Sequence, residues 1–123
     1  MKQVKEITRK RVIIEAEYLR LPTEEEGLKF IEKFSKAVGM TIVYGPFAGA
    51  WAHQAMPDKY GAWEAYAIWA ESGIHMYVWE KAPLITFEIF TCKEFDIDTA
   101  LRVIKEEFEI SRIAYRNVDP PLE

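Results

Sequence analysis

The chain has 123 residues, of which half are hydrophobic and 29% are charged, and this balance predicts one globular domain over residues 1–123 rather than a disordered or fibrous protein. A formal net charge of −4 gives no basic field to gather phosphates, so we expect no nucleic-acid partner. Because no apolar run is long enough to span a membrane, no signal peptide begins the chain and the single cysteine permits no internal disulfide, we expect a cytoplasmic protein with no membrane partner.

The first half of the chain predicts a strand, a helix and a second strand. Residues 11–21 alternate between apolar and acidic side chains, as in a half-buried strand. Thr23 and Glu26 have the spacing of a capping box, and apolar residues then recur at helical spacing, so we expect a helix from about Glu24 to Val38. Residues 40–44 predict a short strand. Residues 45–61, interrupted by glycine and proline, predict a loop whose apolar side chains either pack beneath the fold or line a site.

The second half predicts an antiparallel meander, a helix and a last strand. The three strand-like runs of the meander are residues 62–70, 74–79 and 84–92. Asp96 or Asp98 is placed to cap a helix with one apolar face, and residues 110–116 predict the final strand. This order predicts an α+β two-layer sandwich in which two helices cover one face of an antiparallel sheet. The other sheet face is predicted to be apolar as well, and to be buried in a symmetric homodimer.

The sequence Glu71-Ser72-Gly73 lies between two of these predicted strands and permits two interpretations. Serine and glycine are ordinary turn residues, and a turn needs no further function. A serine hydroxyl that directly follows a carbonyl can also attack that carbonyl and cut the chain, here between Glu71 and Ser72.

The segment from Glu71 to Cys92 resembles the prokaryotic and archaeal S-adenosylmethionine decarboxylases, which are pyruvoyl enzymes of polyamine synthesis. The resemblance rests on "AES" ending at Ser72, on Trp79, and on "FTC" ending at Cys92, with the family's separations and no gaps. It implies the S-adenosylmethionine decarboxylase fold and decarboxylation of S-adenosylmethionine for spermidine synthesis. It also implies that Ser72 becomes the pyruvoyl cofactor through self-cleavage and that Cys92 donates a proton to the product.

Several positions depart from the family pattern, and three of them bear on the candidate site. Tyr77 stands where the family has the histidine that promotes the elimination step, Gly73 replaces a second histidine, and Glu64 falls on or near a serine that is also tied to processing. A phenol is a poor base at neutral pH, so Tyr77 does not simply inherit the histidine's role. His75, on the same predicted strand face as Tyr77, is either a substitute base or an ordinary strand residue. We therefore expect the chain to remain largely uncleaved.

These departures leave a second function open. The chain is also consistent with an uncleaved, catalytically inactive homologue that binds a nucleoside-like ligand or a partner chain as a regulatory subunit, and such a protein has no pyruvoyl cofactor. No metal site is predicted, because His53 and His75 have no ligand spacing with the scattered carboxylates. The candidate site residues are Glu71, Ser72, His75, Tyr77 and Cys92.

Overall fold

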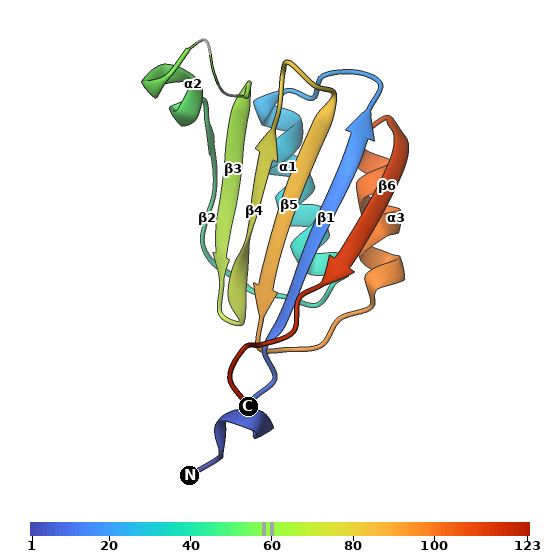
Figure 1. Ribbon diagram of the computed structural model, residues 1–123. Helices are drawn as coiled ribbons and strands as arrows, with labels where there is room; N and C mark the ends of the chain where they lie inside the picture. Colours follow the sequence, from blue (N-terminus) through green and yellow to red (C-terminus); the bar gives the residue numbers. More distant parts are fainter. Residues whose placement is uncertain (58, 60) are drawn as a thin grey trace.

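A computed structural model describes residues 1–57, 59 and 61–123, and it consists of one six-stranded antiparallel sheet with helices packed against it (Figure 1). The elements in chain order are η1 (Val4–Glu6), β1 (Lys10–Tyr18), α1 (Glu24–Ala37), β2 (Ile42–Gly49), α2 (Trp51–Ala55), β3 (Trp63–Trp69), β4 (Ser72–Val78), β5 (Leu84–Thr91), α3 (Ile97–Glu107) and β6 (Ile110–Asn117). The strands lie in the order β2-β3-β4-β5-β1-β6, and each pairs with its neighbours in antiparallel orientation. The predicted α+β class is confirmed.

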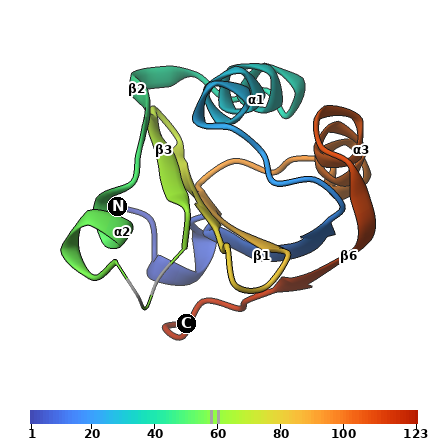
Figure 2. The ribbon, with the colours of Figure 1, turned by 90° about the horizontal axis from the view of Figure 1, so that it is seen from above.

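Helices α1 and α3 cover one face of the sheet, and Figure 2 shows α2 on the opposite side. Successive side chains of a strand point to opposite faces, so every second residue of β1, β3, β4 and β5 enters the core beneath α1 and α3. Core side chains with no exposed surface include Ile14, Phe30, Phe34, Met76, Phe87 and Ile104. Among the residues that the structure describes, no helix combines the length and the apolar character needed to cross a membrane.

The first long helix begins where the capping pattern predicts. The Glu26 amide donates a hydrogen bond of 3.1 Å to the Thr23 hydroxyl, and the Thr23 amide donates one of 2.9 Å to the Glu26 carboxylate. Arg20 forms an ion pair with Glu26 at 2.7 Å. The hydrogen bond from Arg20 makes the largest contribution, and with the bonds from Thr23 it lowers the pKa of Glu26 to about 2. Of the two aspartates considered for the later helix, Asp96 is the cap of α3, accepting the Asp98 amide at 3.3 Å.

The segment predicted as a loop contains regular structure. Strand β2 continues to Gly49 instead of ending near Tyr44, and α2 follows it. The pairing of β2 with β3 shifts register between Ile42 and Tyr44 and again between Tyr44 and Phe47. Such irregularities disrupt the period-2 alternation by which a strand is identified in a sequence, which explains the difference. Residues 58 and 60 of the predicted loop lie outside the described residues.

The turn between β3 and β4 is also placed differently from the prediction. The two-residue turn consists of Ala70 and Glu71, whereas Ser72 and Gly73 are already the first residues of β4. Ser72 pairs with Trp69 across the hairpin, so strand pairing reaches to the turn itself.

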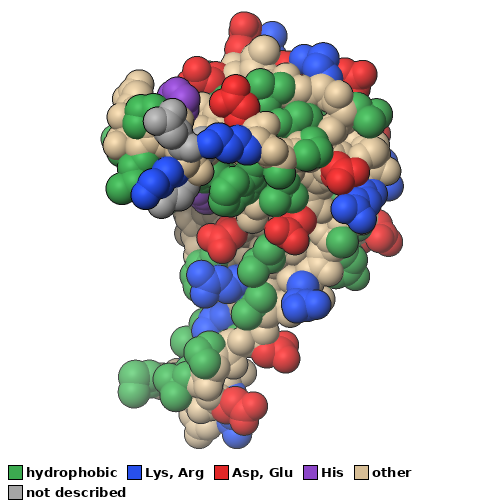
Figure 3. Space-filling model, turned by 45° about the horizontal axis from the view of Figure 1, so that its top comes forward, with side chains coloured by type: hydrophobic (Ala, Val, Ile, Leu, Met, Phe, Trp, Pro, Cys, Tyr) green, Lys and Arg blue, Asp and Glu red, His purple; other side chains and the backbone are tan. Residues whose placement is uncertain are grey.

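The sheet face opposite α1 and α3 is named the open face here. It carries Ile68 and Phe90, each 46% exposed, but the register places His75 and Glu88 on the same face. The space-filling view shows hydrophobic, acidic and basic side chains interspersed (Figure 3). The open face is therefore mixed in character, where the sequence predicted an apolar face.

Candidate functional site

The candidate site is centred on the start of β4, where Ser72 has an unusual backbone conformation. Its φ is 140°, a region that residues with a Cβ atom rarely adopt because of steric conflict with the backbone. Such conformations persist only where the surrounding structure enforces them, and they gather at functional sites. On its other side Ser72 pairs with Thr91, the last residue of β5, whose side chain is fully buried.

The Glu71 carbonyl group, which precedes Ser72, is hydrogen-bonded to Cys92, the cysteine to which the family resemblance also points. The backbone amide of Cys92 donates a hydrogen bond of 2.9 Å to the Glu71 carbonyl oxygen. This is the carbonyl that the Ser72 hydroxyl has to attack if the chain cuts itself. The Cys92 side chain is exposed, and its thiol is free. Glu71, Ser72 and the backbone of Cys92 therefore lie together at one end of the sheet.

A cavity of about 390 Å³ lies beside Ser72 on the open face. Gly73 pairs with Ile68 on β3 and with Phe90 on β5, so a residue without a side chain lies between two exposed apolar ones. The guanidinium of Arg11 lies 5.7 Å from the centre of the Phe90 ring. The cavity is lined by Arg11, Tyr66, Ala67, Ile68, Ser72, Gly73, Ile74, His75, Glu88, Ile89 and Phe90. This mixture of aromatic, aliphatic and charged groups is typical of small-molecule sites.

His75 and Tyr77 both lie on the open face, as strand alternation predicts, but away from the scissile bond. His75 is three residues beyond Ser72 along β4, about 10 Å, and Tyr77 is five residues beyond it, about 16 Å. His75 lines the cavity and lies between Tyr66 and Glu88 in the register. Neither side chain can reach the Ser72 α-proton within one protomer.

Tyr77 and Glu64 have structural roles of their own. The Gly61 amide donates a hydrogen bond of 2.9 Å to the Tyr77 hydroxyl. Glu64 is buried, and its carboxylate accepts the amides of Trp51 at 3.2 Å and Ala52 at 3.1 Å at the start of α2. Because Glu64 pairs with Tyr77 and Trp69 pairs with Ser72, Glu64 lies as far along the hairpin from the turn as Tyr77 does. In one protomer its charge therefore does not oppose attack on the Glu71 carbonyl.

Several residues of the site have no signal in the local sequence. Tyr66, Glu88, Phe90 and Arg11 line the cavity from three different strands, and only the pairing of β3, β4, β5 and β1 brings them together. Thr41, which precedes β2, contacts the turn before Ser72 although 30 positions separate it from Glu71. Registers between distant strands are not encoded in local periodicity.

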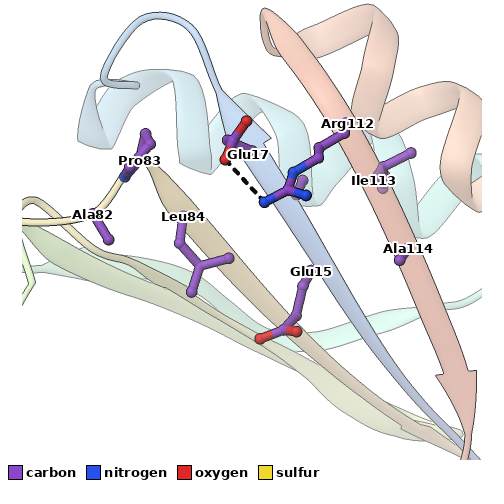
Figure 4. A pocket seen from close by; sticks show the side chains of 9 residues that line it. Glu15, Glu17, Ala82, Pro83, Leu84, Arg112, Ile113 and Ala114 are labelled. Atoms are coloured by element: carbon purple, nitrogen blue, oxygen red, sulfur yellow. Dashed lines mark hydrogen bonds and ion pairs between the residues drawn. The ribbon is translucent and has the colours of Figure 1, made fainter.

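A second cavity of about 460 Å³ lies on the open face at the other end of β5 (Figure 4). There Glu17 forms an ion pair with Arg112 at 3.3 Å, and Leu84 and Glu15 line the space between β5 and β1. None of the candidate site residues belongs to this cavity, although it is the larger one. Within the described residues, no group of three or more His, Cys, Asp and Glu side chains is arranged to hold a metal ion.

Comparison with known proteins identifies the family and supports the fold. The sequence model of the family described as S-adenosylmethionine decarboxylase matches residues 12–119. Among solved structures, the crystal structure of the adenosylmethionine decarboxylase from Aquifex aeolicus VF5 is similar, with a TM-score of 0.66 and 15% sequence identity. The similarity covers 91% of this chain and 89% of that chain, and at this identity it shows a shared fold. No curated protein matches the sequence.

Proposed function

The chain belongs to the S-adenosylmethionine decarboxylase family, and from this premise we propose that it decarboxylates S-adenosylmethionine for polyamine synthesis through a pyruvoyl group made from Ser72. The observation that carries the proposal is the hydrogen bond of 2.9 Å from the Cys92 amide to the Glu71 carbonyl, beside the strained backbone of Ser72. It brings together a polarised carbonyl, an adjacent hydroxyl and a thiol. The same three groups are needed for self-cleavage and for the decarboxylation that follows.

The first step of self-cleavage uses only groups at this end of the sheet. The Ser72 Oγ attacks the Glu71 carbonyl carbon, the C–N bond to Ser72 breaks, and an ester replaces the amide. Negative charge develops on the Glu71 oxygen during the attack, and the Cys92 amide points at that oxygen from 2.9 Å. A preorganised amide donor of this kind stabilises an oxyanion. The residues present therefore fit the step that forms the ester.

The second step needs a base that one protomer does not place near Ser72. The Ser72 α-proton has to be removed while the Cβ–O bond breaks and Glu71 leaves as a carboxylate; water then displaces the nitrogen as ammonia. Both histidines of the chain are among the described residues, and neither His53 on α2 nor His75 on the open face reaches the α-carbon. We infer that elimination is slow, and that most of the chain remains uncleaved.

A second copy of the chain is a further source of groups for this step. We propose a homodimer that buries the open face, because exposed apolar side chains such as Ile68 and Phe90 are stabilised when a partner covers them. The partner presents its own open face, including its copies of His75 and Tyr77, to the cavity beside Ser72.

The cavity and Cys92 suit the substrate class. Tyr66 and Phe90 offer aromatic surface for a planar base, and Glu88 offers a negative charge for a cationic sulfonium or ammonium group. When formed at residue 72, a pyruvoyl group supplies a carbonyl that condenses with the substrate amine and withdraws electrons as carbon dioxide leaves. The exposed Cys92 thiol lies at the same end of the sheet and is the candidate proton donor.

The alternative function is an uncleaved homologue that binds a nucleoside-like ligand or a partner chain as a regulatory subunit. The observation in its favour is the separation of His75 and Tyr77 from Ser72 along β4. The cavity beside Gly73 then serves as a binding site without chemistry.

The intact mass of the purified chain under denaturing conditions separates the two functions. We expect a minor fraction of two pieces that join between Glu71 and Ser72, and a larger cleaved fraction after treatment with hydroxylamine, which cuts an ester at that position. Ser72→Ala is the matched control and gives one species of full mass. A wild-type chain that stays whole with and without hydroxylamine rejects the decarboxylase and leaves the regulatory subunit.

A further inference from the structure

The turn that carries the scissile bond is attached to one residue of another element. The Thr41 amide donates a hydrogen bond of 3.0 Å to Oε1 of the Glu71 side chain. The Thr41 carbonyl oxygen accepts a hydrogen bond of 2.8 Å from the Ala70 amide. Both polar groups of the Thr41 backbone are thus used by the two residues of the β3–β4 turn.

Thr41 is itself in a well-anchored part of the chain. It follows the end of α1, where the Met40 amide donates to the Ser35 carbonyl at 2.8 Å and the Lys93 ammonium donates to the Gly39 carbonyl at 2.8 Å. Lys93 directly follows Cys92, so the connection from α1 to β2 also contacts the segment that holds the Glu71 carbonyl. The turn therefore lies between two fixed attachments, Thr41 and Cys92.

We propose that the side chain of Glu71 is a positioning residue for self-cleavage, which by accepting the Thr41 amide holds its own backbone carbonyl against the Cys92 amide. The inference rests on the proposed function, because it names a second role for the residue whose carbonyl is attacked. The Glu71 carboxylate does not touch the reacting atoms; it acts through the orientation of the turn.

The need for such an attachment follows from the backbone of Ser72. A φ of 140° is unfavourable for a serine, and rotation of the Glu71–Ser72 peptide relieves the strain. That rotation moves the Glu71 carbonyl away from the Cys92 amide. To prevent it, the turn needs a second attachment on the side opposite Cys92. Thr41 supplies this through one bond to the Ala70 amide and one to the Glu71 side chain, and only the second can be removed by a side-chain substitution.

The same attachment operates after cleavage. Glu71 becomes the new chain end, and its side chain is still within reach of the Thr41 amide. The new α-carboxylate then remains beside the Cys92 amide instead of leaving with a released turn.

Amide hydrogen exchange tests the attachment without requiring cleavage. In a Ser72→Ala background, in which every chain stays whole, Glu71→Ala is expected to accelerate exchange at both Thr41 and Cys92 about tenfold, with the amide of Met76 in β4 unchanged. Glu71→Gln keeps an oxygen that accepts the bond and is expected to restore the slow exchange at both amides. Glu80→Ala removes the carboxylate after the other end of β4 and is the matched control, with no change expected.

The acceleration at Cys92 decides the inference, since the Cys92 amide is not bonded to the carboxylate. Acceleration at Thr41 alone, or at neither amide, overturns it. In chains that retain Ser72, Glu71→Ala is expected to lower the fraction cleaved after hydroxylamine treatment about tenfold. Glu71→Gln is expected to leave this fraction at the wild-type level. A wild-type chain without any cleavage overturns the proposed function instead, and the exchange rates still decide whether Glu71 holds the carbonyl.

Discussion

Tyr77 and Glu64 lie directly opposite each other on the open face, in the pairing of β4 with β3. These are two of the positions at which the family resemblance implies a different residue. The departures are therefore neighbours in space, and they change one patch of the sheet surface about 16 Å along β4 from Ser72.

Substitution of Tyr77 by histidine is expected to increase cleavage before Ser72. An imidazole titrates near neutral pH and can remove the α-proton, and a positioned base contributes typically about 100-fold or more to a rate. Within one protomer residue 77 is too far from Ser72, so the effect should depend on a second copy and grow with protein concentration. Intact mass against time measures it, and Thr86→His, on the neighbouring strand and the same face, is the control. Equal cleavage of wild type and Tyr77→His contradicts this role for position 77.

Cys92 is expected to react with iodoacetamide in the folded protein. Its side chain is exposed, and a proton donor has to be reachable by its substrate. Because the chain has one cysteine, the mass increase reports on this thiol alone. A thiol that reacts only in denaturant removes Cys92 from the site.

The open face is expected to form the interface of a homodimer. Phe90 is 46% exposed on this face, so Phe90→Asp should shift the species in light scattering from dimer to monomer. Leu19→Asp is the control, because Leu19 is 72% exposed but lies after the end of β1 and outside the sheet. Wild-type protein that is monomeric at micromolar concentration contradicts the interface.

The start of α1 is expected to lose stability in acid. The hydrogen bonds from Arg20 and Thr23 lower the pKa of Glu26 from 4.5 to about 2 in the folded chain. A depressed folded pKa contributes stability that is present above the unfolded value and is lost as the pH falls toward 2. Glu26→Gln should therefore lower the free energy of unfolding near neutral pH by about 0.5–1 kcal/mol. In urea titrations this difference should shrink as the pH approaches 2; a constant difference assigns the effect to packing.

The sequence by itself determined most of the elements and the family. The capping box at Thr23 and Glu26, the three strands of the meander and the helix capped by Asp96 are local patterns, because caps and periodicity depend on residues a few positions apart. The spacing from Ser72 to Cys92 likewise pointed to the family that the sequence model matches. The second half of β2, which runs on to Gly49, escaped prediction because its register shifts erase the alternation.

Only the tertiary structure decided which of the candidate residues meet. Ser72, His75 and Tyr77 are close in sequence, yet an extended strand carries His75 and Tyr77 about 10 and 16 Å from Ser72. Thr41 and Cys92 are distant in sequence, yet they contact Glu71 from two sides because the ends of β2 and β5 meet the turn between β3 and β4. Local patterns specify an element and its buried face, whereas contact between residues of different elements depends on strand order and register, which the packing of the whole sheet against α1 and α3 fixes.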